Sequence, residues 1–135
     1  MKASSLGFRA AVLLAAVGMA WGIAMAVSQD HSTMPAHAHL NLLGWVSLFL
    51  FGIFYHLHPA IDRSRLALTQ IWIWIVGTTA LSLAVALIYL GYPAADPIAG
   101  ISAFVLLADM LLFGWIVLRA GRVEQVTKTS MLAAE

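Results

Sequence analysis

The chain has 135 residues, of which 62% are hydrophobic and only 10% are charged, and its formal net charge is +1. Soluble domains carry charged residues at about a quarter of their positions, so this composition excludes an ordinary soluble domain and favours a protein embedded in a lipid bilayer. The chain has no cysteine, which excludes disulfides and thiolate metal sites. It also has no basic patch with interleaved aromatic residues, so nucleic acid is not an expected partner.

Four apolar segments, separated by short polar stretches, are each close to the roughly 20 residues needed to cross a bilayer. They lie at about 7–27, 35–57, 66–90 and 97–118. Backbone groups in a bilayer core must bond within their own segment, and the alternation of a β-barrel is missing, so all four are predicted to be helices. The predicted fold is an all-α membrane protein. Four transmembrane helices form one up-down bundle over 1–120, followed by a frayed cytoplasmic tail at 121–135.

The first segment resembles a secretory signal peptide in one respect. Basic residues precede an apolar run, and Ala24-Met25-Ala26 has the small-residue pattern of a cleavage site. The run is longer than the core of most signal peptides, so we expect it to be retained as the first transmembrane helix.

The distribution of basic residues predicts the orientation. With a cytoplasmic N-terminus, every Lys and Arg of the chain falls on the cytoplasmic side, as the positive-inside rule requires. The residues concerned are Lys2, Arg9, Arg63, Arg65, Arg119, Arg122 and Lys128. We therefore expect a multi-pass protein of a bacterial inner membrane, with both termini cytoplasmic and lipid as its surroundings.

Four of the five histidines lie in pairs at the two ends of the second segment. Neutral imidazole binds haem iron, copper and zinc. His37 and His39 are two residues apart and so project about 200° apart on a helix, which favours two different cofactors over one shared metal. His56 and His58, just before Pro59, suit the C-terminal end of that helix and are expected to have a structural role.

Two other interpretations of the outer-face residues remain open. If the helix begins after His39, an extended segment could join both histidines to Asp30, His31 and Met34 around copper or zinc. The histidines could instead be merely interfacial, in an assembly or interaction protein. For His31 alone, the interfacial role is the expected one.

Two polar residues within the segments are further candidates. Asn41 is one turn from His37 and could orient its ring, or join helices. Asp109 is the only carboxylate deep in a segment, and a charge there is costly. It is expected either to transfer protons or to accept a hydrogen bond from a hydroxyl of the third helix. The candidate hydroxyls are those of Thr78, Thr79 and Ser82.

The run "AHAHLNLLGWVSLFLFGIFYHLHP", from Ala36 to Pro59, resembles the tenth helix of subunit I of the haem-copper oxidases. That helix carries His-x-His at its outer end, glycine in its middle and His-x-x-Pro at its inner end. The resemblance implies that His37 matches the ligand of the high-spin haem and His39 that of the low-spin haem.

The departures from that family are equally informative. Its subunit I has twelve helices, and its copper site needs three further histidines, whereas 66–118 contain none. A complete oxygen-reducing centre is therefore not expected. The twelve helices form three arcs of four, with ligands on the second helix of each arc, which implies a homotrimer of this chain.

The expected function is that of a haem b-binding membrane protein for electron transfer, with a redox partner, or for binding O2 or NO. His37 and His39 are the expected iron ligands, supported by Asn41, with Trp45 and Phe49 as pocket walls. Whether the protein is an enzyme is left open. The alternative is a copper- or zinc-binding membrane protein that uses Asp30, His31 and Met34.

Overall fold

The computed structural model describes the backbone of residues 1–132 and the side chains of residues 1–120, and the backbone so described is helical throughout apart from turns. Its elements are α1 (Ala3–Ser28), α2 (Met34–His39), the π-helix η1 (Leu40–Ser47), α3 (Leu48–Leu57), α4 (Pro59–Asp62), α5 (Arg65–Tyr89), the 3₁₀ helix η2 (Pro93–Ala95) and α6 (Asp96–Leu132).

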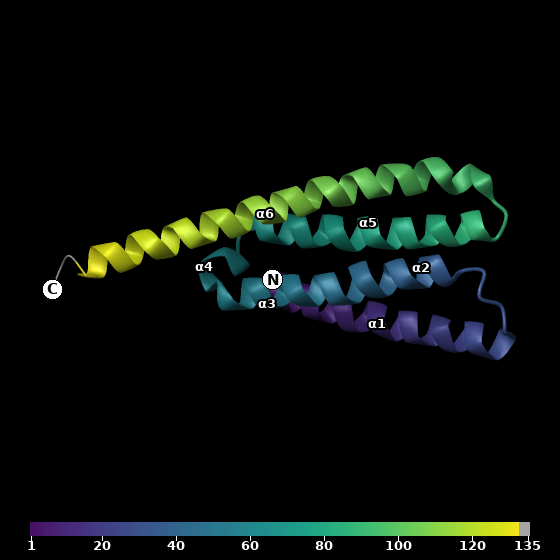
Figure 1. The fold of residues 1–135 in the computed structure, drawn as a ribbon. Coiled ribbons are helices and arrows are strands. Elements are labelled where there is room, and N and C mark those ends of the chain that lie inside the picture. The colour runs from purple at the N-terminus through teal and green to yellow at the C-terminus, as the bar shows by residue number, and fades with distance from the viewer. Residues whose placement is uncertain (133–135) are drawn as a thin grey trace.

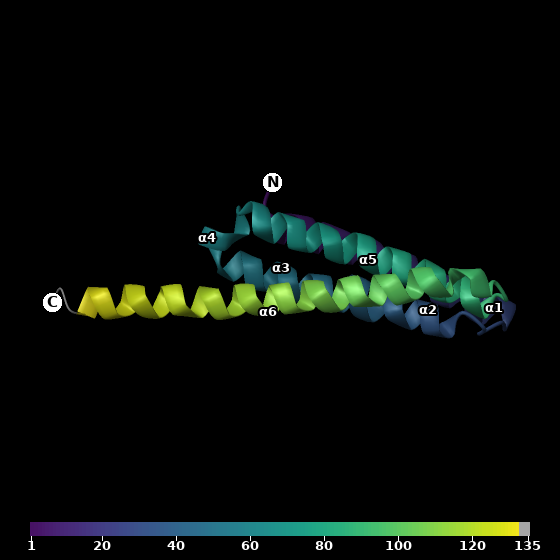
Figure 2. The ribbon, with the colours of Figure 1, turned by 90° about the horizontal axis from the view of Figure 1, so that it is seen from above.

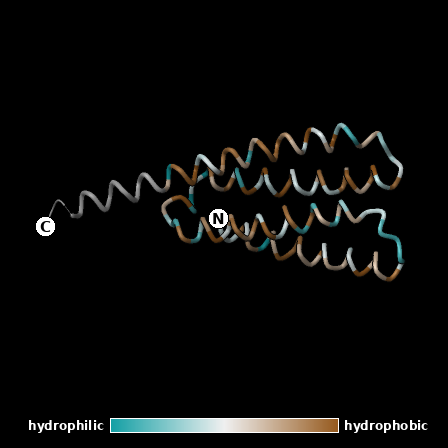
Figure 3. The backbone as a smooth tube through the Cα atoms, viewed as in Figure 1, coloured by the Kyte–Doolittle hydropathy of each residue, from teal (hydrophilic) through white to brown (hydrophobic). Residues whose placement is uncertain are grey.

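Within the residues that the structure describes, four stretches are long and apolar enough to cross a membrane, which confirms the number of predicted segments. They are Ala3–Ser28, Met34–Leu57, Arg65–Tyr89 and Pro93–Ala120. Figure 3 shows mostly hydrophobic residues along all four stretches and hydrophilic residues at the α1–α2 connection. Large apolar side chains are exposed on every one of them, which suits lipid rather than water. The chain has the architecture of a multi-pass membrane protein.

The four spans lie side by side in the order α1, the continuous rod α2–η1–α3, α5 and α6 (Figure 1). Successive spans run in opposite directions. The N-terminus lies at the same end as α4, and the α1–α2 and α5–α6 connections lie at the other end. Gly91, with a φ of +91°, follows the end of α5, in a conformation that glycine adopts without strain. The Ser64 side chain caps the start of α5 by accepting a bond from the Ala67 N–H.

The last helix is longer than predicted. We expected it to end near 118 and give way to a frayed tail, but α6 continues to Leu132 and extends past the other spans (Figure 2). No glycine with positive φ and no proline interrupts it after Pro97. Gly121 sits inside the helix, because a single glycine weakens a helix by only about 1 kcal/mol. Residues 133–135 of the predicted tail lie outside the described part of the chain.

Small residues of α1 allow the second span to approach closely. All the buried residues of α1 except Met25 are Gly, Ala or Ser. A Cβ added at Gly18 would lie 2.5 Å from Oδ1 of Asn41, and one at Gly22 would lie 3.0 Å from the ring of His37. The Gly-x-x-x-Gly spacing of these two residues thus makes room for polar side chains of the neighbouring helix.

Candidate functional site

One ring nitrogen of His39 is hydrogen-bonded, and the other has no partner among the side chains described for residues 1–120. Its Nδ1 donates to the carbonyl oxygen of Pro35, one turn earlier, at 2.7 Å. Because a carbonyl can only accept, the hydrogen of the neutral ring is on Nδ1, and Nε2 keeps its lone pair. This is the arrangement in which histidine binds metals, with the second nitrogen fixed by a carbonyl.

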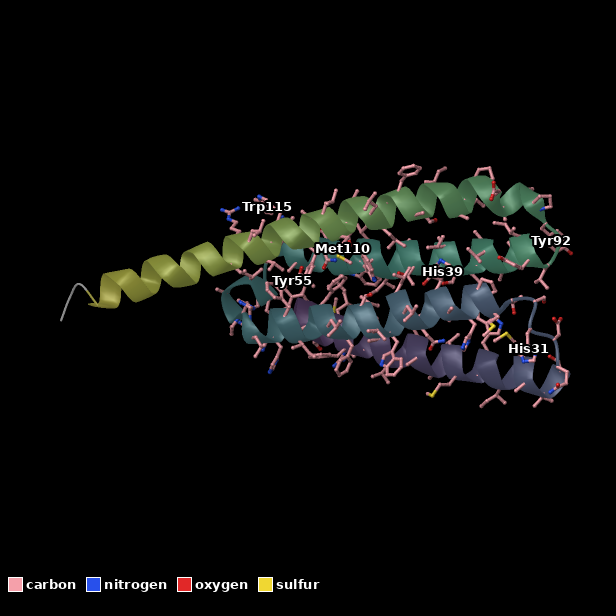
Figure 4. The ribbon with its side chains drawn as sticks, viewed as in Figure 1. His31, His39, Tyr55, Tyr92, Met110 and Trp115 are labelled. Carbon is pink, nitrogen blue, oxygen red and sulfur yellow. The ribbon has the colours of Figure 1, made fainter. Side chains whose placement is uncertain are left out.

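The ring of His39 lines a groove of about 440 Å³ between the α2–η1 segment, α5 and α6. Figure 4 shows His39 on the side of α2 that faces α5 and α6. The remaining lining residues are all apolar: Pro35, Ala38, Leu42, Leu43, Leu81, Ala103 and Leu106. The volume is within the range of cofactor sites, about 300–1,000 Å³. Ala38, Leu42 and Ala103 are exposed, so the groove opens on the bundle surface.

The π-helix η1 begins directly after His39 and forms one wall of the groove. In a π-helix the turns are wider, and carbonyl groups become available to side-chain donors. Here Trp74 Nε1 donates to the carbonyl oxygen of Leu43 at 2.9 Å, and Ser47 Oγ donates to that of Leu42 at 3.0 Å. The Trp74 indole belongs to α5 and is buried, so this bond joins α5 to the η1 wall of the groove.

His37 lies on the opposite side of the same helix and packs against Gly22 of α1. Asn41 Nδ2 donates to the backbone carbonyl of His37 at 2.9 Å and lies 3.3 Å from each of its ring nitrogens. Asn41 therefore contacts the His37 ring, as the spacing suggested, but selects neither nitrogen. The structure does not bring His37 and His39 to one site within the chain, in agreement with the predicted divergence of about 200°.

Trp45 and Phe49 do not line the groove. Both are exposed on the bundle surface, and Phe49 packs against Phe8 of α1. They point away from the groove because π and α turns place residues 45 and 49 on another face of the rod than Leu42 and Leu43. The residues that α5 and α6 contribute to the groove are Leu81, Ala103 and Leu106. Nothing in the local sequence distinguishes them from other apolar residues of these helices, so they were not identified from the sequence.

The alternative loop site is not assembled in the described part of the chain. Among those residues no three His, Cys, Asp or Glu side chains are gathered as a metal site would require. The Ser32 N–H donates to Asp30 Oδ1 at 2.9 Å and lowers the pKa of that carboxyl. His31 lies at the end of the bundle (Figure 4), and the segment that this alternative required to be extended is helical from Met34 onward.

At the other end of the span, His58 has the structural role that we predicted. Its Nδ1 donates to the carbonyl oxygen of Phe54 at 2.7 Å, and its ring stacks on the Phe54 ring at 4.3 Å. The bond satisfies a carbonyl in the last turn of α3, just before Pro59 starts a new helix. His56 is exposed and lies 6.3 Å from the ring of Phe8.

Asp109 belongs to a buried hydrogen-bonded chain across three helices. Tyr55 Oη donates to Gln70 Oε1 at 3.0 Å, and Gln70 Nε2 donates to Asp109 Oδ2 at 2.8 Å. The expected hydroxyl partners were wrong. Thr79 bonds within its own helix, and the buried hydroxyls of Thr78 and Ser82 have no partner in the described structure. Gln70 was overlooked because a glutamine near the start of a helix gives no sign of which way it faces.

Comparisons of the chain with protein-family models, with curated proteins and with solved structures found no match.

Proposed function

We propose that this chain is an integral membrane protein that binds haem b through His39 in the groove between α2–η1, α5 and α6. The carrying observation is the fixed ring of His39, whose Nδ1 is held by the Pro35 carbonyl at 2.7 Å and whose other nitrogen is left for iron. The apolar lining of the groove suits a porphyrin. The resemblance of Ala36–Pro59 to the haem-bearing helix of the haem-copper oxidases supports the same cofactor.

Each residue of the groove has a defined task in this proposal. His39 supplies an axial ligand, and the Pro35 carbonyl holds its tautomer and orientation. Leu43, Leu81 and Leu106 exclude water from the porphyrin face. The haem supplies the redox or gas-binding chemistry, and the protein tunes it through the axial ligand and the polarity of the pocket.

A second axial ligand from the same chain is not within the groove, because His37 packs against α1 on the far side of the helix. We propose that a second copy of the chain covers the open side of the groove and that three copies associate, as the three arcs of the oxidase subunit suggest. Ligation by two histidines would make the protein an electron carrier, whereas an open sixth position would bind O2 or NO.

The absorption spectrum of the protein purified from membranes tests this function. We expect a Soret band that shifts on reduction with dithionite, and sharp reduced α and β bands if two histidines bind the iron. A protein with neither haem nor metal would contradict the proposal and leave an interaction role. A colourless protein with stoichiometric copper or zinc would favour the outer loop with Asp30, His31 and Met34.

We further propose that both termini are cytoplasmic in a bacterial inner membrane. The N-terminus with Lys2 and the α4–α5 turn with Arg63 lie at one end of the bundle, where Arg65 begins α5 (Figure 1). The connections at the other end have no Lys or Arg.

Because the chain lacks cysteine, single-cysteine variants test this orientation. Ala94 and Ala60 are both exposed and lie beyond opposite ends of α5. We expect a membrane-impermeant maleimide to label Ala94→Cys in intact spheroplasts and to label Ala60→Cys only after lysis. The reverse pattern would overturn the orientation.

A further inference from the structure

Asp109 of α6 is a buried carboxyl group that is hydrogen-bonded, through Gln70, to a second buried polar side chain, Tyr55. Asp109 is only 3% exposed, and Tyr55 and Gln70 are fully buried. Of its two oxygens, Oδ2 accepts from Gln70, while Oδ1 has no hydrogen-bond partner in the described structure. Buried polar atoms are nearly always paired, so an unpaired carboxyl oxygen inside a membrane bundle calls for a chemical explanation.

The surroundings do not compensate a negative charge on Asp109. Among the side chains that the structure describes, its one hydrogen-bond partner is the uncharged amide of Gln70. The nearest basic residue on its own helix is Arg119, ten residues and about 15 Å further along the axis. An unpaired carboxylate in such surroundings is strongly unfavourable, whereas the neutral acid avoids the cost of burying a charge.

Asp62 shows what a paired buried carboxylate looks like in the same chain. It is also 3% exposed, but its Oδ1 accepts from the Ser4 N–H at 2.7 Å and its Oδ2 from the Ser4 hydroxyl at 2.9 Å. Both oxygens act as acceptors, as those of an ionised carboxylate do. The two acids therefore differ in hydrogen bonding and not in burial.

Polar side chains continue from Gln70 along one face of α5. Trp74, Thr78 and Ser82 follow at intervals of four residues, and all are buried. The hydroxyls of Thr78 and Ser82 have no partner in the described structure. Gln70, the hydrogen-bond partner of Asp109, is thus the first residue of a row of buried polar side chains along α5.

We propose that Asp109 is a proton-binding site within the membrane: it carries a proton on its carboxyl group, held in place through Gln70 and Tyr55, and exchanges that proton with solvent. No bond other than O–H is made or broken, and the proton passes to and from water. The site does not depend on the presence of haem.

Infrared spectroscopy of the full chain in a maltoside detergent, which has no ester carbonyl, tests the proposal at neutral pH. We expect a carboxylic-acid C=O band above the amide I region that moves to lower frequency in D2O. The band should be absent in Asp109→Asn and shifted but present in Asp109→Glu. Asp62→Asn is the matched control and should leave the band unchanged.

Three results would overturn the proposal. A wild-type spectrum without the band would mean that Asp109 is ionised. A band that persists in Asp109→Asn, or is lost in Asp62→Asn, would assign the proton to another acid. A band that does not move in D2O would show a locked proton rather than an exchanging one. If Asp109→Asn does not fold, the shift in Asp109→Glu carries the assignment.

Discussion

Replacing His39 with alanine is expected to remove haem from the protein. The substitution deletes the nitrogen proposed to bind iron and the ring that the Pro35 carbonyl orients. Mutating a residue that only hydrogen-bonds to a metal ligand lowers metal affinity about 10–100-fold. Removing the ligand itself should therefore lower haem occupancy by more than about tenfold. The measurement is the Soret absorbance per protein after purification in haem-sufficient cells.

Two further histidine variants make this result specific. His56→Ala, on the same span but exposed at its other end, should keep wild-type haem content. His37→Ala should keep haem but lose the sharp reduced bands if the equivalent histidine of a second copy is the sixth ligand. The assignment of His39 would be wrong if His37→Ala lost the haem and His39→Ala retained it.

Replacing Gly18 with leucine is expected to destabilise the bundle by about 1–3 kcal/mol, the usual cost of overpacking. Even the Cβ would lie 2.5 Å from Asn41 Oδ1, so Asn41 must move and give up its bond to the His37 carbonyl. The rest of the leucine would then separate α1 from η1. Unfolding in a titration from mild detergent into dodecyl sulfate, followed by tryptophan fluorescence, measures the change.

Gly100→Leu is the matched control for this prediction. A Cβ at Gly100, on α6, meets nothing within 4 Å, so the same change of side chain should not destabilise the bundle. Equal stabilities of the two variants would contradict the close approach of α1 to the second span. Reduced stability of both would indicate a general intolerance of leucine at helix glycines.

The sequence by itself determined the four helical spans, because a bilayer leaves the backbone little choice. It did not reveal the π-turns of η1 or the continuation of α6 to Leu132. Apolar segments of about 20 residues must satisfy their own hydrogen bonds, and the breaks at Pro59 and Gly91 end helices for local steric reasons. The same regularity made the divergence of His37 and His39 predictable, because residues two positions apart on an α-helix project about 200° apart. The proximity of Asn41 to His37 likewise follows from a spacing of four.

The tertiary structure alone decided what these side chains meet. Which residues of α5 and α6 face His39 depends on the rotation of each helix about its own axis. Apolar surface on all sides of a membrane helix leaves that rotation unmarked in the sequence. The same rotation gave Asp109 its partner in Gln70 rather than in Thr78, and the π-turns of η1 turned Trp45 away from the groove. Packing between segments far apart in the sequence determined these contacts, and no local sequence pattern predicts them.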